Sequence, residues 1–509
     1  MNIENLQSNA LAKAGLVTGI SLVLGLLFDY FLYEKIPGIA FPLYVLLVVI
    51  GLFVIANFFK KQISKEVFWL LVPLIFFSAM VFVRSSELLT FLNMAASLLL
   101  LLVIAEISFG EKIKNFLVSD YIKIFFLPFK FIRPLFQTLS NLFSPRGVKK
   151  DQRVLLQVAK GILMTIPVLF VFLLLFSSAD LIFQKYVSDL INIDIESETV
   201  FRSILVLFTT LVYIGAYSYS FREKKNQIIA QQNSRSYNVG RIESSILLGS
   251  VNVLFFVFMF VQIAYLFGGE SNISAQGFTY AEYARRGFFE LIAVAIISLL
   301  LLLITEKYVV KKETDHLLGF KILSAALAVQ VILIMASAFT RLSLYEEAYG
   351  FTILRLYSHA FIILLAIIFC LLFYKIYKDK RENTFAFRVF ISIILFLAVM
   401  NFLNPDKFIA RRSIERFAIT GKLDIYYLSH LSDDAISDTI KVLSVPNEDL
   451  RNVFARELYW HIQNSNSLSS YFSKWQSLNV SRMRADKILN SKIRELEPYK
   501  DYQSIERYE

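Results

Sequence analysis

Ionisable side chains at the ends of apolar stretches are the residues of this chain whose chemistry could serve a function. Within the segment 279–291, Glu282, Arg286 and Glu290 are spaced four apart, so on a helix they share one face and can pair. Alternatively, arginines in such a place can hold a phosphate, because the guanidinium group binds phosphate through two parallel hydrogen bonds. Once the chain is threaded through a bilayer as described below, a larger group falls at the outer membrane surface. Its members are Asp180, Arg202, Glu282, Arg285, Arg286, Glu290, Arg341, Glu346, Glu347 and Arg355. Three interpretations stay open: ion pairs between helices, an outward anion pocket, and ordinary solvated charges.

His359 is the second candidate, because ionisable residues inside a membrane are costly and often functional. The sequence places it some nine residues into the tenth apolar stretch, roughly 13 Å deep. Arg355 lies one helical turn above it on the same face. Histidine titrates near neutral pH, so a proton relay is one interpretation. The other is a neutral ring that is hydrogen-bonded to a neighbouring helix.

Motifs for catalysis or for a cofactor are missing from the sequence. The four histidines are scattered without the spacing of a metal site, and Cys370 is the single cysteine, so no disulfide forms within the chain. Gly421-Lys422 lacks the upstream glycine of a phosphate-binding loop. Glu282 or Glu290 could act as the base of an intramembrane transferase, but a carboxylate paired with arginine is a weak base. We therefore expect no catalytic residue, no metal and no cofactor.

The elements that position these residues are apolar stretches long enough to cross a membrane. The chain has 509 residues, of which 56% are hydrophobic, and it contains 49 phenylalanines. A membrane crossing needs about 20 apolar residues, and a backbone in lipid must satisfy its own hydrogen bonds, so these stretches should be helices. The sequence predicts an all-α polytopic membrane bundle of about eleven spans. Their approximate ranges are 11–31, 36–58, 67–83, 88–108, 159–182, 200–221, 246–267, 286–304, 317–339, 350–374 and 385–403.

Charge in the connections predicts the orientation. Lysine and arginine gather after every second stretch, whereas the alternate connections are poor in them or acidic. The basic connections lie at 60–65, 112–153, 222–241, 307–312 and 375–381. Basic loops stay in the cytoplasm, so the N-terminus is expected there and the C-terminus outside the cell membrane. The net charge of +11 therefore reflects membrane topology and does not indicate a nucleic-acid partner.

The same pattern divides the chain into four segments. A four-span segment occupies 1–110, a basic loop 111–157, a seven-span segment 158–403, and an extracytoplasmic helical domain 404–509. Apolar side chains at helical spacing and several cations fill the loop, which is expected to lie on an anionic lipid leaflet. A partly buried connecting segment is the alternative. The residues that suggest the lipid contact are Ile122, Lys123, Phe125, Phe126, Phe129 and Lys130.

The segment 404–509 is predicted to form a small α-helical hairpin domain. A first helix should end at Gly421, a second should begin with Asp433 and Asp434 after Ser432, and a third should follow Asn447. Such a module typically binds something, here an envelope protein. A lid that packs on its own membrane helices is the alternative.

Five segments resemble those of an uncharacterised bacterial membrane family, domain of unknown function 4173, with its relative 4153. The segments are 177–180, 279–289, 341–355, 404–417 and 421–435, and the last two are the most specific. The likeness covers roughly residues 150–490 and leaves the first four spans outside. It implies a bacterial inner-membrane bundle with a helical tail, and it implies no reaction, substrate or site.

Few deep polar residues and a separate tail predict a non-catalytic scaffold or sensor. The alternative is a carrier or flippase for an amphipathic anion or lipid phosphate, which would use the outer arginines.

Overall fold

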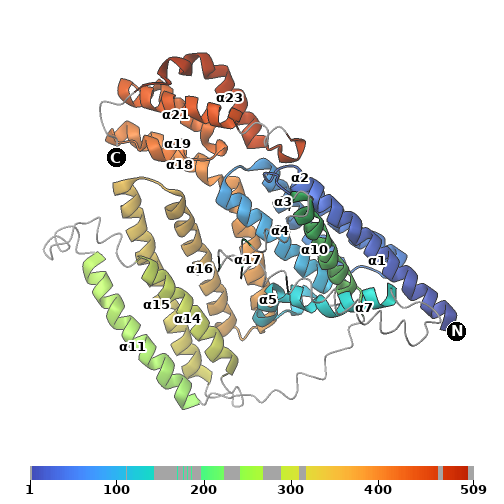
Figure 1. Ribbon diagram of the computed structural model, residues 1–509. Coiled ribbons are helices and arrows are strands. Elements are labelled where there is room, and N and C mark those ends of the chain that lie inside the picture. The colour runs from blue at the N-terminus through green and yellow to red at the C-terminus, as the bar shows by residue number, and fades with distance from the viewer. Residues whose placement is uncertain are drawn as a thin grey trace. The chain divides into compact units, whose positions relative to one another are not determined.

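A computed structural model shows the chain as a set of long helices followed by a group of shorter ones (Figure 1). The structure describes residues 3–110, 112–142, 197–222, 241–266, 288–308, 317–467 and 474–502, together with Leu169, Phe176, Asp180 and Lys185. Within these residues every regular element is helical. The all-α fold expected from the sequence is confirmed.

Nine helices among the described residues are long and apolar enough to cross a membrane. They belong to α1 (Ile3–Leu32), α2 (Ala40–Phe58), α3 (Lys65–Val83), α4 (Glu87–Ile107), α10 (Ser197–Ser220), α11 (Arg241–Leu266), α15 (Leu317–Tyr349), α16 (Ile353–Tyr377) and α17 (Glu382–Leu403). A further helix, α14 (Phe288–Tyr308), coincides with the expected stretch 286–304. The expected stretch 159–182 lies outside the described residues, apart from three isolated positions.

The chain forms two compact units, and the first contains residues 1–75, 97–111 and 123–223. Here α1 packs along α10, and one close approach explains the contact. A Cβ atom added to Gly25 would lie 2.2 Å from Thr210 Oγ1, so only glycine fits at this place. At the loop end of α2, Lys61 Nζ donates a 2.8 Å hydrogen bond to the Phe221 carbonyl oxygen. The connections after α2 and α10 therefore lie together within this unit.

Short helices follow α4: η1 (Ile113–Asn115), α5 (Val118–Phe125), α6 (Leu127–Lys130) and α7 (Ile132–Leu142). In the first unit, Leu127 and Phe131 are buried against Tyr219 of α10. Their neighbours Phe125 and Phe129 point away and are 63% and 71% exposed. The segment is thus amphipathic, with one face packed on α10.

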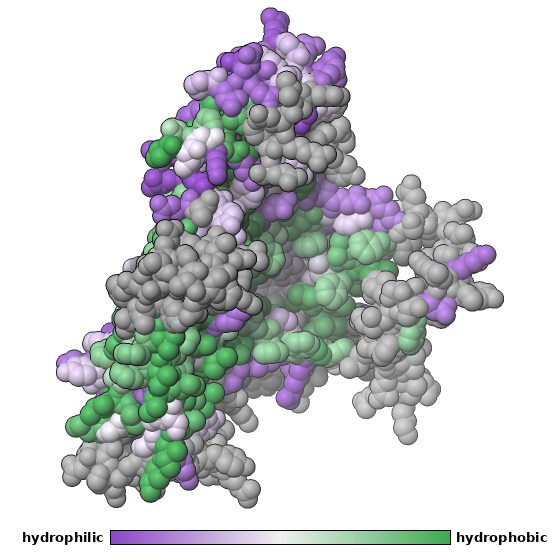
Figure 2. Space-filling view, turned by 90° about the vertical axis from the view of Figure 1, so that its left-hand side faces the viewer, coloured by the Kyte–Doolittle hydropathy of each residue, from purple (hydrophilic) through white to green (hydrophobic). Residues whose placement is uncertain are grey.

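The second unit contains residues 76–96, 112–122 and 224–509. Its apolar core joins α11, α14, α15 and α16, and Phe385 of α17 completes it. In Figure 2 the surface of the C-terminal helices is largely hydrophilic, whereas the long helices of this unit present apolar side chains. On α11, for example, Val253, Leu254 and Phe260 are each at least 65% exposed. Apolar side chains in such number on the outside fit a lipid solvent.

Helix α15 extends ten residues beyond the stretch expected to end at position 339. It ends only at Gly350, which takes the left-handed conformation with φ of 82°. Hydropathy alone predicts the end of the span at position 339, just before the charged residues. However, Arg341 and Glu346 are 6% and 7% exposed and lie on the helix, so the charges did not interrupt its hydrogen bonding.

The C-terminal module, residues 404–502 as described, begins directly after α17. Asn404 turns the chain in the left-handed conformation, and Pro405 occupies the first position of α18 (Pro405–Thr420), where its missing N–H costs nothing. The other elements are α19 (Ile425–Ser429), η4 (Asp433–Ala435), α20 (Ile436–Thr439), η5 (Ile440–Ser444), α21 (Glu448–Ser467), η6 (Trp475–Ser477), α23 (Val480–Leu496) and η7 (Glu497–Tyr499). Their buried side chains form one core, against which Ile353 and Leu356 of α16 also pack.

The three helix boundaries expected in the module are confirmed. Gly421 ends α18 with φ of 67°, and the Asn447 side chain accepts a 3.0 Å hydrogen bond from the Leu450 N–H at the start of α21. Ser432 makes no such capping bond, but a helical segment does begin at Asp433, where the 3-10 turn η4 continues directly into α20 and η5. The expected second helix is therefore present but is partly of the 3-10 type, and the side chain of Asp434 in its first turn bonds to the α3–α4 turn.

Candidate functional site, a buried carboxylate cluster

Of the polar residues expected at the outer surface, the structure brings together those at the end of α15 and the start of α16. His359 Nδ1 lies 3.1 Å from Glu346 Oε1, and both side chains are nearly buried. His359 Nε2 lies 3.2 Å from Ser343 Oγ, and the Phe339 ring meets the imidazole edge-on at 4.4 Å. Each ring nitrogen of His359 thus has a partner on the neighbouring helix.

The Arg355 guanidinium group at this end has two partners within the protein. It donates to the Gly350 carbonyl oxygen and lies 4.2 Å from the centre of the Tyr345 ring. Arg341 is buried, and Glu347 is exposed. Arg355 is thus engaged by groups of its own helix pair, and the anion pocket stays a prediction.

The remaining members of the expected cluster are not gathered here. Glu290 is exposed on α14, and Asp180 is exposed at an isolated described position. Arg202 belongs to the other unit, where its guanidinium group makes two hydrogen bonds to the Asp29 carboxylate, at 3.0 and 2.6 Å. Glu282, Arg285 and Arg286 lie outside the described residues, so their pairing stays a prediction.

Sequence reasoning missed a different polar group, which we call the carboxylate cluster: Asp406 and Asp434 with Ser85, Ser86 and Ser432. It joins the turn between α3 and α4 to the C-terminal module, within the second unit. Asp434 Oδ2 accepts hydrogen bonds from the Ser85 and Ser86 backbone N–H groups, at 2.8 and 3.0 Å. The Ser85 hydroxyl oxygen in turn accepts a 3.0 Å bond from the Asp434 N–H.

The second carboxylate, Asp406, lies beside the first and is 2% exposed. Its Oδ1 atom accepts a 3.2 Å hydrogen bond from the Ser86 hydroxyl, and its Oδ2 atom accepts one of 3.2 Å from the Ser432 N–H. The turn at Asn404 and Pro405 places Asp406 in the first turn of α18, where the helix dipole favours a negative charge. Asp406 therefore contacts both Ser86 of the α3–α4 turn and Ser432, which directly precedes the η4 turn that carries Asp434.

Arg84 supplies the positive charge of the site. Its Nη1 atom lies 3.6 Å from Asp434 Oδ1, and its Nη2 atom donates a 2.6 Å hydrogen bond to the Asn401 carbonyl oxygen. That carbonyl lies in the last turn of α17, where helix carbonyls lack partners of their own. One arginine thus links the α3–α4 turn, the end of α17 and the module.

The start of α23 closes the site from the other direction. The Asn479 amide nitrogen donates to the carbonyl oxygens of Val81 and Arg84, at 3.1 and 2.8 Å, while its oxygen caps α23. The Ser481 hydroxyl lies within hydrogen-bond distance of the Val83 carbonyl oxygen and of Asp434 Oδ1. The module therefore caps the C-terminal end of α3, whose last carbonyls have no helical partners.

A reciprocal amide pair continues the polar contacts into the apolar helices. Asn93 of α4 and Asn401 of α17 are fully buried, and each side-chain nitrogen donates a 2.8 Å hydrogen bond to the other's oxygen. Side-chain amides hydrogen-bonded between spanning helices hold neighbours in register. The pair fixes α4 against α17 next to the carboxylate cluster, since Asn401 also accepts the hydrogen bond from Arg84.

Burial sets the electrostatics of the site. Removal from water raises the pKa of Asp406 above its usual 3.8, and the nearby charge of Asp434 raises it further. Hydrogen bonds from Ser432 and Ser86 act against this rise without cancelling it. Asp406 is thus a carboxyl group that takes up a proton more readily than a free aspartate.

A second charged group lies within the module. His461 Nε2 is 3.1 Å from Asp433 Oδ1, and this hydrogen bond raises the pKa of the imidazole above 6.5 despite partial burial. Arg482 Nε lies 3.9 Å from Asp433 Oδ2, and burial raises the pKa of the neighbouring Asp486 carboxyl. Among the residues that the structure describes, no group of three or more His, Cys, Asp or Glu side chains could hold a metal ion.

The fold and the site together define an integral membrane protein whose C-terminal module is fastened to its own membrane helices. The chain belongs to the family described as Domain of unknown function (DUF4153), whose model matches residues 71–442. This is the relative named with the resemblance above, and the match includes α4 and the part of α3 from residue 71 onward, which that resemblance left outside. The matched region thus contains both sides of the carboxylate cluster. No curated protein and no solved structure matches the chain.

Proposed function

We propose that this protein is a non-catalytic membrane scaffold or sensor, which presents its C-terminal module on the outer side of the cell membrane to an envelope protein. The observation that carries the proposal is the seating of Asp434 on the Ser85 and Ser86 N–H groups. A partner that displaces the η4 turn would have to disturb these bonds and the α3–α4 turn with them. The contact thus offers a physical route from the module to the membrane helices.

The orientation rests on which ends of the helices are basic. In the second unit, Lys375, Lys378 and Arg381 lie at the junction of α16 and α17, whereas the module packs at the opposite end of α16. Lysine and arginine favour the cytoplasmic side, so the module would face outward, with the N-terminus inside and the C-terminus outside the bacterial inner membrane.

A site-specific photo-crosslinking experiment in intact cells tests the proposal. A photoreactive amino acid replaces Tyr426 of the module, which is 68% exposed, and in the control it replaces Tyr377 at the other end of α16, which is 65% exposed. We expect the first position alone to give a discrete adduct with an envelope protein, and Asp434→Ala to reduce it. Identical adducts from both positions, or none from Tyr426, would contradict the proposal.

We also propose that the segment α5–α7 lies on anionic lipid. Within the first unit, Phe125, Phe126 and Phe129 expose more than half of their side chains, and the cations Lys130 and Arg133 lie exposed beside them. Aromatic rings flanked by cations suit the headgroup region of an anionic leaflet. The test is the thermal stability of the full chain in nanodiscs with and without anionic lipid. Replacing the three phenylalanines by serine should weaken the stabilising effect of the anionic lipid, and an unchanged effect would refute the contact.

A further inference from the structure

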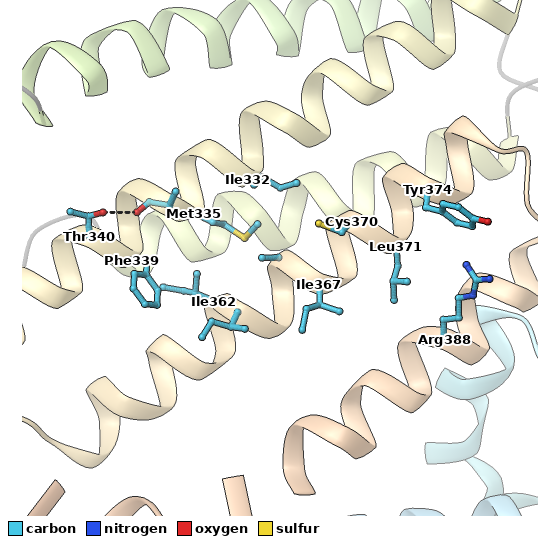
Figure 3. A pocket seen from close by; sticks show the side chains of 13 residues that line it. Ile332, Met335, Phe339, Thr340, Ile362, Ile367, Cys370, Leu371, Tyr374 and Arg388 are labelled. Carbon is cyan, nitrogen blue, oxygen red and sulfur yellow. Dashed lines mark hydrogen bonds between the residues drawn. The ribbon is translucent and has the colours of Figure 1, made fainter. Parts of the chain in front are cut away.

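An apolar groove runs along α16, between α15 and the start of α17, and Figure 3 shows its lining. It has a volume of about 770 Å³. Ile363, Ile367, Cys370 and Tyr374 recur at the spacing of one helix face and are exposed along it. Met335 of α15 forms part of the opposite wall. The groove is therefore a continuous apolar surface in the part of the unit that lies in hydrocarbon.

The length of the groove fits one leaflet of a bilayer. From Ile363 to Tyr374 the helix advances eleven residues, or about 16 Å. Half of a hydrocarbon core is about 15 Å thick. The groove thus extends from the basic end of α16 to the middle of the membrane, which is the depth that one acyl chain occupies.

The cationic side chain of Arg388 lies at the basic end of the groove. Arg388 of α17 extends toward Tyr374 in Figure 3, with its guanidinium carbon 5.0 Å from the centre of that ring. It lies six residues after the start of α17, about 9 Å along the helix, from where an arginine reaches the interface. Among the residues that the structure describes, no carboxylate pairs with it. By contrast, the nearby Lys375 is neutralised by Glu306 at 2.6 Å.

We propose that this groove binds one anionic phospholipid, whose phosphate is held by Arg388 and whose acyl chain lies along Ile363, Ile367 and Cys370. An arginine in a spanning helix requires a counter-charge, and a lipid phosphate supplies one with matching hydrogen-bond geometry. The inference does not rest on the proposed function. It also concerns the opposite end of the helices from the outer arginines predicted from the sequence.

Native mass spectrometry of the full-length protein tests the site. The protein is incubated with phosphatidylglycerol or with phosphatidylcholine of the same acyl chains, and the retained lipid is counted. We expect one phosphatidylglycerol molecule to be retained with an affinity at least about tenfold above that of phosphatidylcholine, as one charge-assisted contact allows. Arg388→Gln should abolish this preference, whereas Arg411→Gln, which removes an exposed arginine of the module, should leave it unchanged. Equal retention of the two lipids by the wild type would overturn the proposal.

Further measurements distinguish a bound lipid acyl chain from other molecules that could occupy the groove. Ile367→Trp fills the groove and should abolish retention of the lipid, whereas Ile393→Trp, at a similarly exposed position outside the lining, should not. Inorganic phosphate at millimolar concentration should not compete, and full competition would show a phosphate site in place of a lipid site. Cys370 is the single cysteine, so oxidation that joins two chains through it would show that a second copy covers the groove, and this also overturns the proposal.

Discussion

Replacing Asp434 by alanine should release the module from the α3–α4 turn. The substitution removes the acceptor of the Ser85 and Ser86 N–H groups and leaves the Arg84 charge without its carboxylate. Removing one partner of a buried, hydrogen-bonded charge pair costs about 3–5 kcal/mol. Asp434→Asn keeps one acceptor oxygen and the shape of the side chain, so its cost should be about 1–3 kcal/mol. Asp501→Ala, at an exposed position of the same module, should change stability by less than about 0.5 kcal/mol.

Hydrogen exchange of the Ser85 and Ser86 amides measures this cost locally, in the full-length protein in nanodiscs. Each 1.4 kcal/mol corresponds to a tenfold change, so exchange should accelerate by about 10² to 10³-fold or more in Asp434→Ala. Asp434→Asn should give an intermediate rate, and Asp501→Ala the wild-type rate. Exchange in Asp434→Ala within about threefold of the wild type would refute the reasoning, because water would then satisfy the turn as well as the carboxylate does.

Three other results are expected. The raised pKa of Asp406 means that the native state binds the Asp406 proton more tightly than the unfolded chain does, so stability should fall as pH rises from 3.8 through the native pKa. Thermal unfolding of Asp406→Asn should lose this pH dependence, and an unchanged pH profile would contradict the prediction. The raised pKa of His461 beside Asp433 means that the stabilisation from the protonated imidazole is complete below pH 6.5 and is lost as pH rises through the native pKa. His461→Gln should remove this loss from the pH profile of thermal unfolding. If the loss persists in the variant, another group causes it. Gly25→Ala should destabilise the packing of α1 on α10 by about 1–3 kcal/mol. In thermal unfolding, Gly19→Ala should be tolerated because an added Cβ there meets no atom within 4 Å, and equal melting temperatures for the two variants would refute the close approach.

The spanning helices could be predicted because lipid imposes a simple rule of length and apolarity. Ten of the eleven expected stretches correspond to helices that the structure describes, and the remaining one, 159–182, lies outside the described residues apart from three isolated positions. The largest difference is at α15, which was expected to end at position 339, before Arg341 and Glu346, and which continues to Tyr349. Charges end a hydrophobic stretch without ending its hydrogen-bonded helix, so hydropathy locates the membrane boundary better than the helix boundary.

The carboxylate cluster could not be predicted from local spacing. Asp434 binds Ser85 across 349 positions of sequence, and nothing near either residue indicates the other. The Ser432-Asp433-Asp434 pattern also matches the start of a helix, which gave a local explanation for the acidic residues. The segments 404–417 and 421–435 that carried the strongest resemblance do contain both carboxylates. These segments indicated that the two aspartates matter, but only the three-dimensional structure shows which residues the aspartates contact.

The contacts of His359 could be predicted in part from the sequence. The sequence placed it on the face of α16 that carries Arg355, and both residues lie at the same end of the helix pair. Its partner Glu346 was expected at the outer surface, but their direct contact depends on the unexpected length of α15. Pairing between helices could be anticipated from the cost of lone charges in lipid, whereas the identity of the partner could not.

The direction in which the module faces is tested most directly by thiol labelling from one side of the membrane. In a Cys370→Ser background, single cysteines are placed by Ile419→Cys in the module, where the side chain is 87% exposed, and by Lys378→Cys at the far end of α16. A membrane-impermeant maleimide added to intact spheroplasts should label the first variant alone, and after permeabilisation it should label both. Labelling of the Lys378→Cys variant alone in intact spheroplasts would contradict an envelope-facing module.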